Sequence, residues 1–202
     1  MEGLKYINML VEDIHSATVA TIGKDGYPQT RIVDMMYYDD NGVYFLTAKG
    51  KEFYSQLMKQ KFVAISATKD KIAVSLRGKI KNIGNKNLDI IFDNNPYMKK
   101  IYPKETKDVL EVFCLYEAVG EYFDISNPSK IFRDSIEIGC KDYKKNGYYV
   151  TKCCIGCNKC YLACPQKCID IYSIPVVIDQ NHCLHCKRCV DVCPMQCIKK
   201  IS

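Results

Sequence analysis

The sequence predicts an α+β protein with two domains, a larger one built mainly from antiparallel strands with a few helices and a small α+β one. Short alternating segments separated by turns fill the first part of the chain, which favours a barrel. A cysteine pattern occurs twice near the C-terminus, and 202 residues accommodate one ordinary domain and a small one. We place the first domain at 1–126, a connecting segment at 127–147 and the second domain at 148–202.

The first elements follow from periodicity and turn residues. Apolar residues at helical spacing between Glu2 and Ile14 predict an opening amphipathic helix. Alternating runs bounded by turns at 23–26 and 39–42 then predict three strands. These strands cover Ser16–Ile22, Gln29–Tyr38 and Val43–Thr47.

The later elements are expected on the same grounds. Helices are predicted at 51–61, 86–92 and 104–110, and strands at 62–66, 72–77, 111–119 and 120–125. The connecting segment favours a short helix within 131–145 and a turn at Asn146-Gly147. A first small strand of the second domain is expected at 148–151.

Two matched runs of C-x2-C-x2-C-x3-C-P, 29 residues apart, set the chemistry of the second domain. They resemble the runs that hold 4Fe–4S clusters in bacterial two-cluster ferredoxins, where the fourth cysteine of each run binds the other cluster. The domain is therefore expected to be ferredoxin-like, with two 4Fe–4S clusters. One ligand set is Cys154, Cys157, Cys160 and Cys193, and the other is Cys183, Cys186, Cys189 and Cys164.

Disulfides and zinc are the alternatives for these cysteines. The cysteine count is 13, which is odd, and a zinc ribbon needs four ligands, not two matched runs of four. The roles of the remaining five cysteines are left open, although burial as small apolar residues is the simplest interpretation. These are Cys114, Cys140, Cys153, Cys168 and Cys197. His15 and His185 are expected to be structural or exposed, with an N–H bond to cluster sulfur as the alternative for His185.

The order of elements in the first domain resembles the pyridoxamine 5′-phosphate oxidase-like, FMN-binding split barrels. The segments that carry the resemblance are Ser16–Ile22, Gly26–Val33, Gly42–Lys51 and, after a helix, Phe62–Ile65. The resemblance covers roughly residues 1–125 and implies a split β-barrel that binds FMN at the interface of a homodimer. The substrate-binding C-terminal segment of the vitamin-forming oxidases has no clear counterpart here.

The resemblance also implies the flavin-binding residues. Arg31, with the backbone of Ile32 and Val33, would line the flavin, and Thr47 would bond the phosphate or the ring edge. Lys49 and Lys51 would meet the phosphate beside a helix N-terminus, which favours anions. Solvated surface positions are the alternative for both lysines.

The charge and the hydropathy of the chain limit the kinds of binding partner that can be expected. The formal net charge is +6, but bound clusters are anionic and no basic stripe is present, so nucleic acid is not expected. No signal peptide or long apolar run is present, so no membrane partner is expected and the location is predicted to be cytoplasmic. The expected clusters and the many thiols favour a reducing, oxygen-poor location.

These observations predict an FMN and iron–sulfur oxidoreductase. Clusters transfer single electrons, whereas a flavin can exchange two, so the cofactors complement each other. The partner would be a soluble electron donor or acceptor protein or a nicotinamide. A non-enzymatic electron carrier or redox sensor and a pyridoxamine-phosphate-oxidase-type enzyme are the alternatives. The sequence does not identify the substrate, any catalytic side chain or the direction of electron flow.

Overall fold

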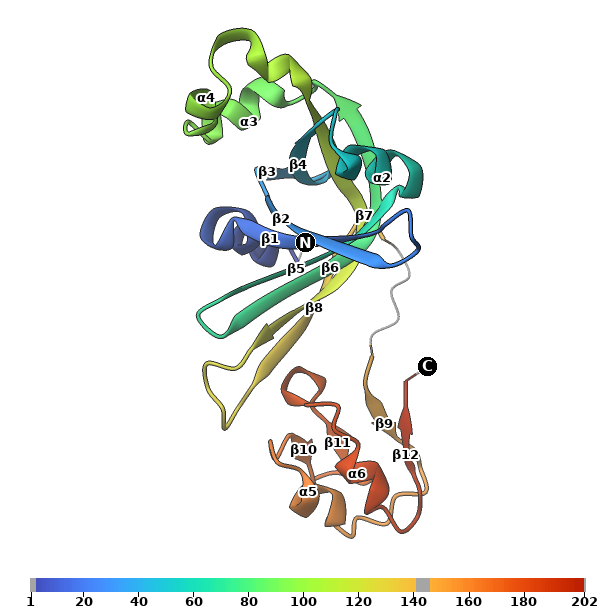
Figure 1. Cartoon of the computed structure of the whole chain (residues 1–202). Coiled ribbons are helices and arrows are strands. Elements are labelled where there is room, and N and C mark those ends of the chain that lie inside the picture. The colour runs from blue at the N-terminus through green and yellow to red at the C-terminus, as the bar shows by residue number, and fades with distance from the viewer. Residues whose placement is uncertain (1–2, 141–145, 202) are drawn as a thin grey trace. The chain divides into compact units, whose positions relative to one another are not determined.

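The computed structural model describes residues 3–140 and 146–201. These residues form two compact units, each of which draws on separate parts of the chain (Figure 1). The first unit comprises Met1–Lys69, Ala73–Tyr122 and Ser135–Lys141. The second comprises Asp70–Ile72, Phe123–Asp134 and Asp142–Ser202.

An eight-stranded sheet dominates the first unit, with the strand order β2-β1-β5-β6-β7-β4-β3 and with β8 paired to β7. The pairs β1–β2, β1–β5, β3–β4 and β4–β7 are all antiparallel. The strands are β1 Ser16–Ile22, β2 Pro28–Asp34, β3 Tyr37–Asp39, β4 Gly42–Ala48, β5 Phe62–Lys69, β6 Ile72–Gly84, β7 Leu110–Asp124 and β8 Phe132–Ile138. The α+β class predicted from the sequence is confirmed.

Few helices accompany this sheet, and they pack on it through apolar side chains. The elements are α1 Leu4–Asn8, the π-helix η1 Met9–Ile14, α2 Glu52–Gln60, α3 Leu88–Asn94, α4 Met98–Ile101 and the 3₁₀ helix η2 Lys104–Val109. Ile91 and Phe92 of α3 and Met98 of α4 belong to one buried cluster with Tyr44 of β4 and Val112 of β7. This cluster fixes α3 and α4 beside the β4 end of the sheet (Figure 1).

Several predicted boundaries in the first unit are wrong. The strand expected over Gln29–Tyr38 breaks because Met35 and Met36 are both buried, which strand alternation does not allow. The two strands expected at 111–119 and 120–125 are one strand, β7. Gly120 lies inside it because a neighbouring backbone approaches closely there, not because the chain turns.

The predicted helices also need correction. The opening helix is split into α1 and η1, and Glu2 lies outside the described residues. The helix expected at 86–92 starts later, and the one expected at 104–110 is a 3₁₀ helix. The helix expected within 131–145 is wrong, because Phe132–Ile138 form β8 on the edge of β7. The part of that prediction over 141–145 lies outside the described residues.

The second unit contains short strands and helices that repeat with the cysteine runs. The elements are β9 Tyr148–Val150, α5 Lys159–Ala163, β10 Ile169–Asp170, β11 Val177–Ile178, the 3₁₀ helix η3 Gln180–His182, α6 Arg188–Asp191 and β12 Ile198–Lys200. Their buried residues form a separate core that includes Ile169, Val176, Ile178 and Ile198.

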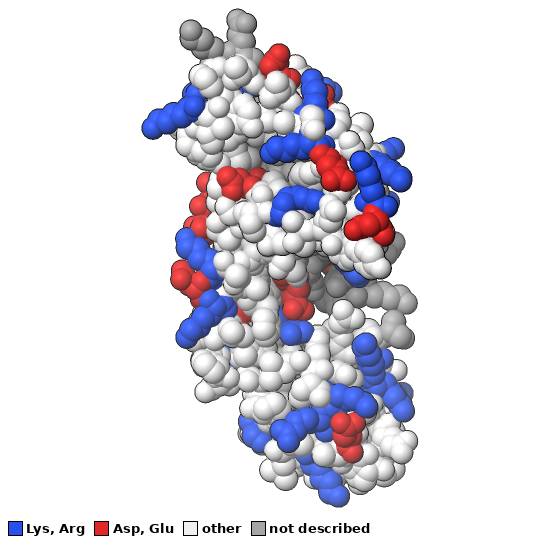
Figure 2. Space-filling view, viewed as in Figure 1, with Lys and Arg blue, Asp and Glu red and all other residues white. Residues whose placement is uncertain are grey.

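Among the described residues, no helix combines the length and apolar composition needed to cross a membrane. On the face shown in Figure 2, basic side chains are interspersed with acidic ones over the first unit. That face therefore carries no stripe of a single charge over the first unit.

Replacement of Gly120 tests the close packing of β6 against β7. A Cβ at Gly120 would lie 1.9 Å from the carbonyl oxygen of Ser75, so Gly120→Ala forces the strands apart. We expect a loss of about 2 kcal/mol in the free energy of unfolding, measured by urea denaturation. Gly50→Ala is the control, because a Cβ there meets nothing within 4 Å. Equal stabilities of the two variants would contradict this account.

Candidate functional site

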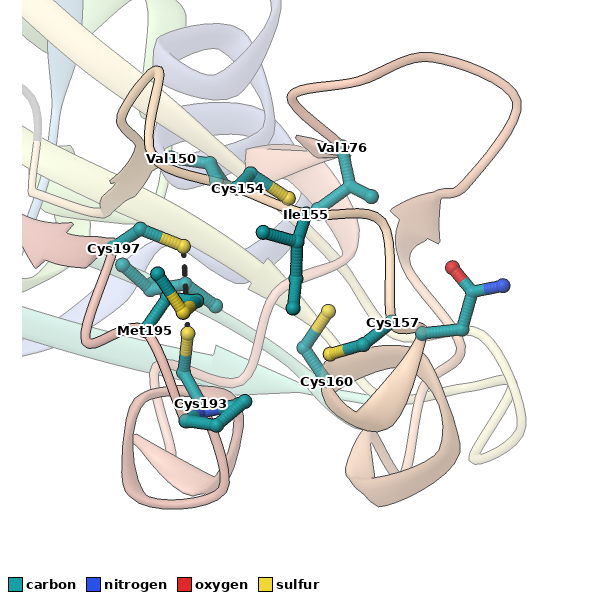
Figure 3. Close-up of a pocket in the computed structure, with 12 residues that line it drawn as sticks. Val150, Cys154, Ile155, Cys157, Cys160, Val176, Cys193, Met195 and Cys197 are labelled. Atoms are coloured by element: carbon teal, nitrogen blue, oxygen red, sulfur yellow. Dashed lines mark hydrogen bonds between the residues drawn. The ribbon is translucent and has the colours of Figure 1, made fainter.

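Four cysteines drawn from both runs line one cavity of the second unit. Cys154, Cys157 and Cys160 come from the first run, and Cys193 comes from the end of the second (Figure 3). Apolar side chains complete the lining, among them Val150, Ile155, Val176, Met195 and Ile198. The structure thus brings together the four residues that the sequence assigns to one cluster.

A second cavity has the reciprocal composition. Cys183, Cys186 and Cys189 of the second run line it with Cys164 from the end of the first. The other lining residues include Tyr148, Pro165, Ile169, Ile178 and Leu184. Thiols in an apolar surround provide soft ligands and little water, which suits an iron–sulfur cluster.

The strand pairing explains how the ligand sets cross. The two repeats exchange strands: β9, which starts the first repeat, pairs with β12, which ends the second. In return β10, which ends the first repeat, pairs with β11, which starts the second. Each fourth cysteine lies just before an exchanged strand, so it is carried to the other half. Neither half can complete a cavity alone.

Two further cysteines sit beside the candidate ligands. Cys168 is 8% exposed and its Sγ lies 3.6 Å from that of Cys164, while Cys197 is 2% exposed and its Sγ lies 3.4 Å from that of Cys193. Both line the cavities, so they are more than remote core residues. A hydrogen bond from the Cys168 thiol also lowers the pKa of Cys183, against the opposing effect of burial.

The other unassigned cysteines do not line the two cavities. Cys153 is exposed, whereas Cys114 is buried in the first unit and Cys140 is half-buried there. Among the described residues, no three Cys, His, Asp or Glu side chains converge closely enough to hold a single metal ion.

The segment 123–134 belongs to the second unit and contacts the side that holds the second run. The backbone N–H of Ile131 donates to Gln166 over 2.9 Å, and His182 Nδ1 lies 2.6 Å from the carbonyl oxygen of Ile131. Arg133 places a guanidinium nitrogen 2.6 Å from His185 Nδ1. His185 is half-buried, not exposed as expected, and burial and the charge of Arg133 lower its pKa.

A cavity in the first unit collects five of the six residues assigned to the flavin. Its wall comprises Arg31, Ile32, Val33, Asp34, Met36, Leu46, Thr47, Lys51, Phe53 and Met98. Strands β2 and β4 supply most of these residues, and the start of α2 supplies Lys51 and Phe53. Met36 lies between β2 and β3, and Met98 begins α4. Sequence analysis did not find the apolar members Met36, Leu46, Phe53 and Met98, because nothing distinguishes them from ordinary core residues.

Thr47 carries the clearest sign of a missing polar partner. The residue is 3% exposed, and its Oγ1 is buried without a hydrogen-bond partner among the described residues. A buried hydroxyl without a partner costs free energy, so such a group is normally satisfied. Lys51 forms the N-cap of α2 without a side-chain cap, leaving first-turn N–H groups available beside it. This arrangement fits the phosphate of a bound nucleotide.

Arg31 is held in place by side chains from three elements. Its guanidinium donates to Thr21 Oγ1 over 2.5 Å and to Gln56 Oε1 over 3.0 Å, and a longer 3.4 Å contact reaches Gln29. The guanidinium also lies over the Phe53 ring, 4.4 Å from its centroid. Burial lowers the pKa of Arg31. These neighbours fix the orientation of Arg31, the charged residue that the sequence places in the middle of a predicted strand.

Lys49 does not line this cavity. Its ammonium group pairs with Glu111 at 3.5 Å and is more than half exposed. Tyr54 donates to Glu111 over 2.6 Å and Asn82 donates over 2.5 Å, and these bonds lower the pKa of the carboxyl group. The phosphate role assigned to Lys49 remains a prediction that this conformation does not favour.

A polar network at Asp34 reaches the same cavity. Ser16 and Tyr97 donate to the two carboxylate oxygens over 2.6 and 2.8 Å, and His15 Nε2 lies 3.0 Å from the Tyr97 hydroxyl. Burial opposes ionisation of Asp34, but these hydrogen bonds and His15 together lower its pKa. The register of β1 against β2 pairs Ser16 with Asp34, so a hairpin prediction could have found that contact. Nothing in the sequence places Tyr97 there.

Comparisons with known proteins match both parts of the chain. Residues 5–117 match the family model described as pyridoxamine 5′-phosphate oxidase, and residues 146–194 match the 4Fe-4S dicluster domain. Similar curated proteins include pyridoxine/pyridoxamine 5′-phosphate oxidases of Allorhizobium ampelinum and Rhizobium leguminosarum bv. trifolii, 25% and 28% identical over 117 residues. The matches cover 55% and 54% of this chain and 57% and 56% of those proteins. The chain thus spans little more than half the length of these relatives.

Solved structures show the same fold. A NimC/NimA family protein from Clostridium acetobutylicum has a TM-score of 0.57 at 16% identity, over 67% of this chain and 94% of that one. A protein of that organism related to general stress protein 26 has a TM-score of 0.53 at 19% identity, over 68% and 95%.

The fold and the cysteine-lined cavities define a redox protein with a split β-barrel and a 4Fe–4S domain. The chain belongs to the pyridoxamine 5′-phosphate oxidase family.

The Asp34 network predicts a dependence of stability on acid pH. The folded-state pKa of Asp34 lies below its unfolded value of about 3.9, so its contribution is complete above that value and is lost as pH falls through the folded pKa. Asp34→Asn should remove about 0.5 kcal/mol near pH 7, a small value because the side chain is about one-third exposed. Urea unfolding between pH 3 and 7 should show a shallower acid slope in the variant. An unchanged slope would contradict this assignment.

Proposed function

We propose that this protein is an FMN- and 4Fe–4S-dependent oxidoreductase that passes electrons between two clusters and a substrate or redox partner bound at the flavin. The observation that carries the proposal is the presence, in one chain, of two cavities that each collect four cysteines of the repeated runs and of a barrel cavity with a buried hydroxyl that has no partner among the described residues. When bound, the clusters supply single-electron transfer and the flavin supplies two-electron chemistry.

The chain's own residues bind and shield these groups. The eight cysteines of the two runs are the proposed ligands, in the crossed sets that line the two cavities. Thr47 and Lys51 would hold the flavin phosphate, while Arg31 and the backbone of Ile32 and Val33 would lie along the flavin. No side chain has to act as a nucleophile in such a reaction.

A homodimer is part of this proposal. Ile32 is an apolar residue on the cavity wall and is 67% exposed. Large exposed apolar side chains beside a binding cavity favour coverage by a partner surface. A second copy of the chain would cover it, as the family resemblance implies. A soluble protein or a nicotinamide would exchange electrons with the assembly.

Adjacent cysteines provide a matched test of cluster binding. Anaerobically purified protein should contain about eight iron and eight sulfide atoms per chain. Cys154→Ser should lose iron and visible absorbance, because Cys154 lines the first cavity. Cys153→Ser should retain both, since Cys153 is exposed and outside that lining. Equal iron contents in the two variants would exclude the proposed ligand set.

Thr47→Val tests the flavin site separately. Loss of one hydrogen bond to a charged phosphate should weaken FMN binding about tenfold in a fluorescence titration. The folded protein without flavin should be at least as stable as the wild type, because an unpaired buried hydroxyl is removed. Thr30→Val is the control, as Thr30 is exposed on β2 and outside the cavity lining. Unchanged FMN affinity in Thr47→Val would contradict the site.

Turnover distinguishes the proposal from the two alternatives. Oxidation of NADH, NADPH or a reduced ferredoxin by the loaded protein, coupled to reduction of an added acceptor, is the expected result. Reversible reduction without turnover would indicate an electron carrier or redox sensor. Formation of an aldehyde from pyridoxamine phosphate would indicate the oxidase activity named for the curated relatives.

A further inference from the structure

The two cysteine repeats share an unusual backbone, although the residues at matching positions differ. Three pairs of positions 29 residues apart have a positive φ: 156 and 185, 158 and 187, and 167 and 196. In the first pair, Gly156 has a φ of 66° whereas His185 has a φ of 54°. Glycine adopts this conformation freely, but histidine is strained in it.

A strained residue persists where its side chain makes a contact that glycine could not make. For His185 that contact is Arg133, whose guanidinium nitrogen lies 2.6 Å from His185 Nδ1. A guanidinium group only donates hydrogen bonds, so Nδ1 accepts and the neutral ring carries its proton on Nε2. The backbone N–H of the same histidine donates to Cys183 Sγ over 3.4 Å. His185 thus joins Arg133 to the second cysteine set.

Further contacts within the second unit fix the side chain and the backbone of Arg133 beside His185. Its guanidinium lies 5.0 Å from the centroid of the Phe123 ring, and its carbonyl oxygen accepts from Asn181 over 3.1 Å. His185 Nε2 is buried, so water screens this pair weakly. The matching position of the first repeat is Gly156, which has no side chain to hold such a cation.

We infer that Arg133, positioned by His185, makes the two clusters unequal by raising the reduction potential of the one held by Cys164, Cys183, Cys186 and Cys189. Reduction adds one negative charge to a cluster, and a fixed nearby cation stabilises the reduced form more than the oxidised form. Electrons therefore collect on this cluster, whereas the first cluster has the lower potential. The inference rests on the proposed clusters but not on the flavin.

The experiment is an anaerobic redox titration followed by EPR, on full-length protein with its clusters. The wild type should show two separate one-electron steps. Arg133→Gln should lower the higher of the two reduction potentials and so narrow the gap between them. The expected change is about tenfold in the reduced-to-oxidised ratio of that cluster, or about 59 mV for one electron. Arg133→Lys, which keeps the charge, should retain most of the gap.

His185→Gly tests the positioning role without strain, since it restores the residue found at position 156. It should fold at least as stably as the wild type, bind the same iron, and narrow the gap as Arg133→Gln does. Arg188→Gln is the control, because it removes an exposed cation beside Cys189 and should leave the gap unchanged. A purely structural role for Arg133 would change iron content or stability and not the gap.

Three outcomes would overturn the inference: coincident steps in the wild type, an unchanged gap in Arg133→Gln, or equal shifts in Arg133→Gln and Arg188→Gln. Cluster-loaded protein without flavin would refute the proposed function but leave this measurement intact. Protein without iron would refute both.

Discussion

The exchange of strands between the two repeats is the constraint on which the second unit depends. Because β9 pairs with β12 and β10 with β11, each cysteine-lined cavity is closed by residues from both halves. A unit this small buries little apolar surface, so bound clusters would also serve as covalent cross-links. Folding and cofactor loading are then one event, since neither core nor cavity exists in half of the sequence.

The barrel cavity depends on hydrogen bonds between polar side chains, which orient one another. Arg31 is fixed by Thr21 and Gln56 and by the ring of Phe53, and its charge is partly desolvated at the cavity wall. Asp34 lies close by with its own donors, Ser16 and Tyr97. The cavity thus holds a cation and an anion that already have hydrogen-bond partners, whereas Thr47 Oγ1 has none within the part of the chain that the structure describes. Such preorganisation leaves the hydroxyl available to a ligand at little reorganisation cost.

Cysteine spacing was the most informative part of the sequence, because ligand positions in a tight loop follow from the chain alone. Spacing alone grouped Cys154, Cys157 and Cys160, whereas the addition of Cys193 came from the resemblance to two-cluster ferredoxins; the structure places all four around one cavity. Contacts that depend on tertiary structure could not be foreseen. Arg133 was part of an expected helix, yet it lies on β8 and reaches His185 from 52 residues away. The strand boundary predicted before Gly120 was likewise wrong, because the close approach of a neighbouring strand is what requires glycine there.

The loop that joins the repeats gains a distinct role from the strand exchange. Residues 171–176 contain no cysteine and connect β10 to its own partner β11. Two separate copies of such a half would have to find each other by diffusion, with a concentration-dependent equilibrium. A six-residue tether replaces that encounter with an intramolecular one at high effective concentration. The present arrangement is therefore equivalent to a symmetric dimer of half-modules joined by a covalent tether, in which the two cysteine-bearing loops need not be identical.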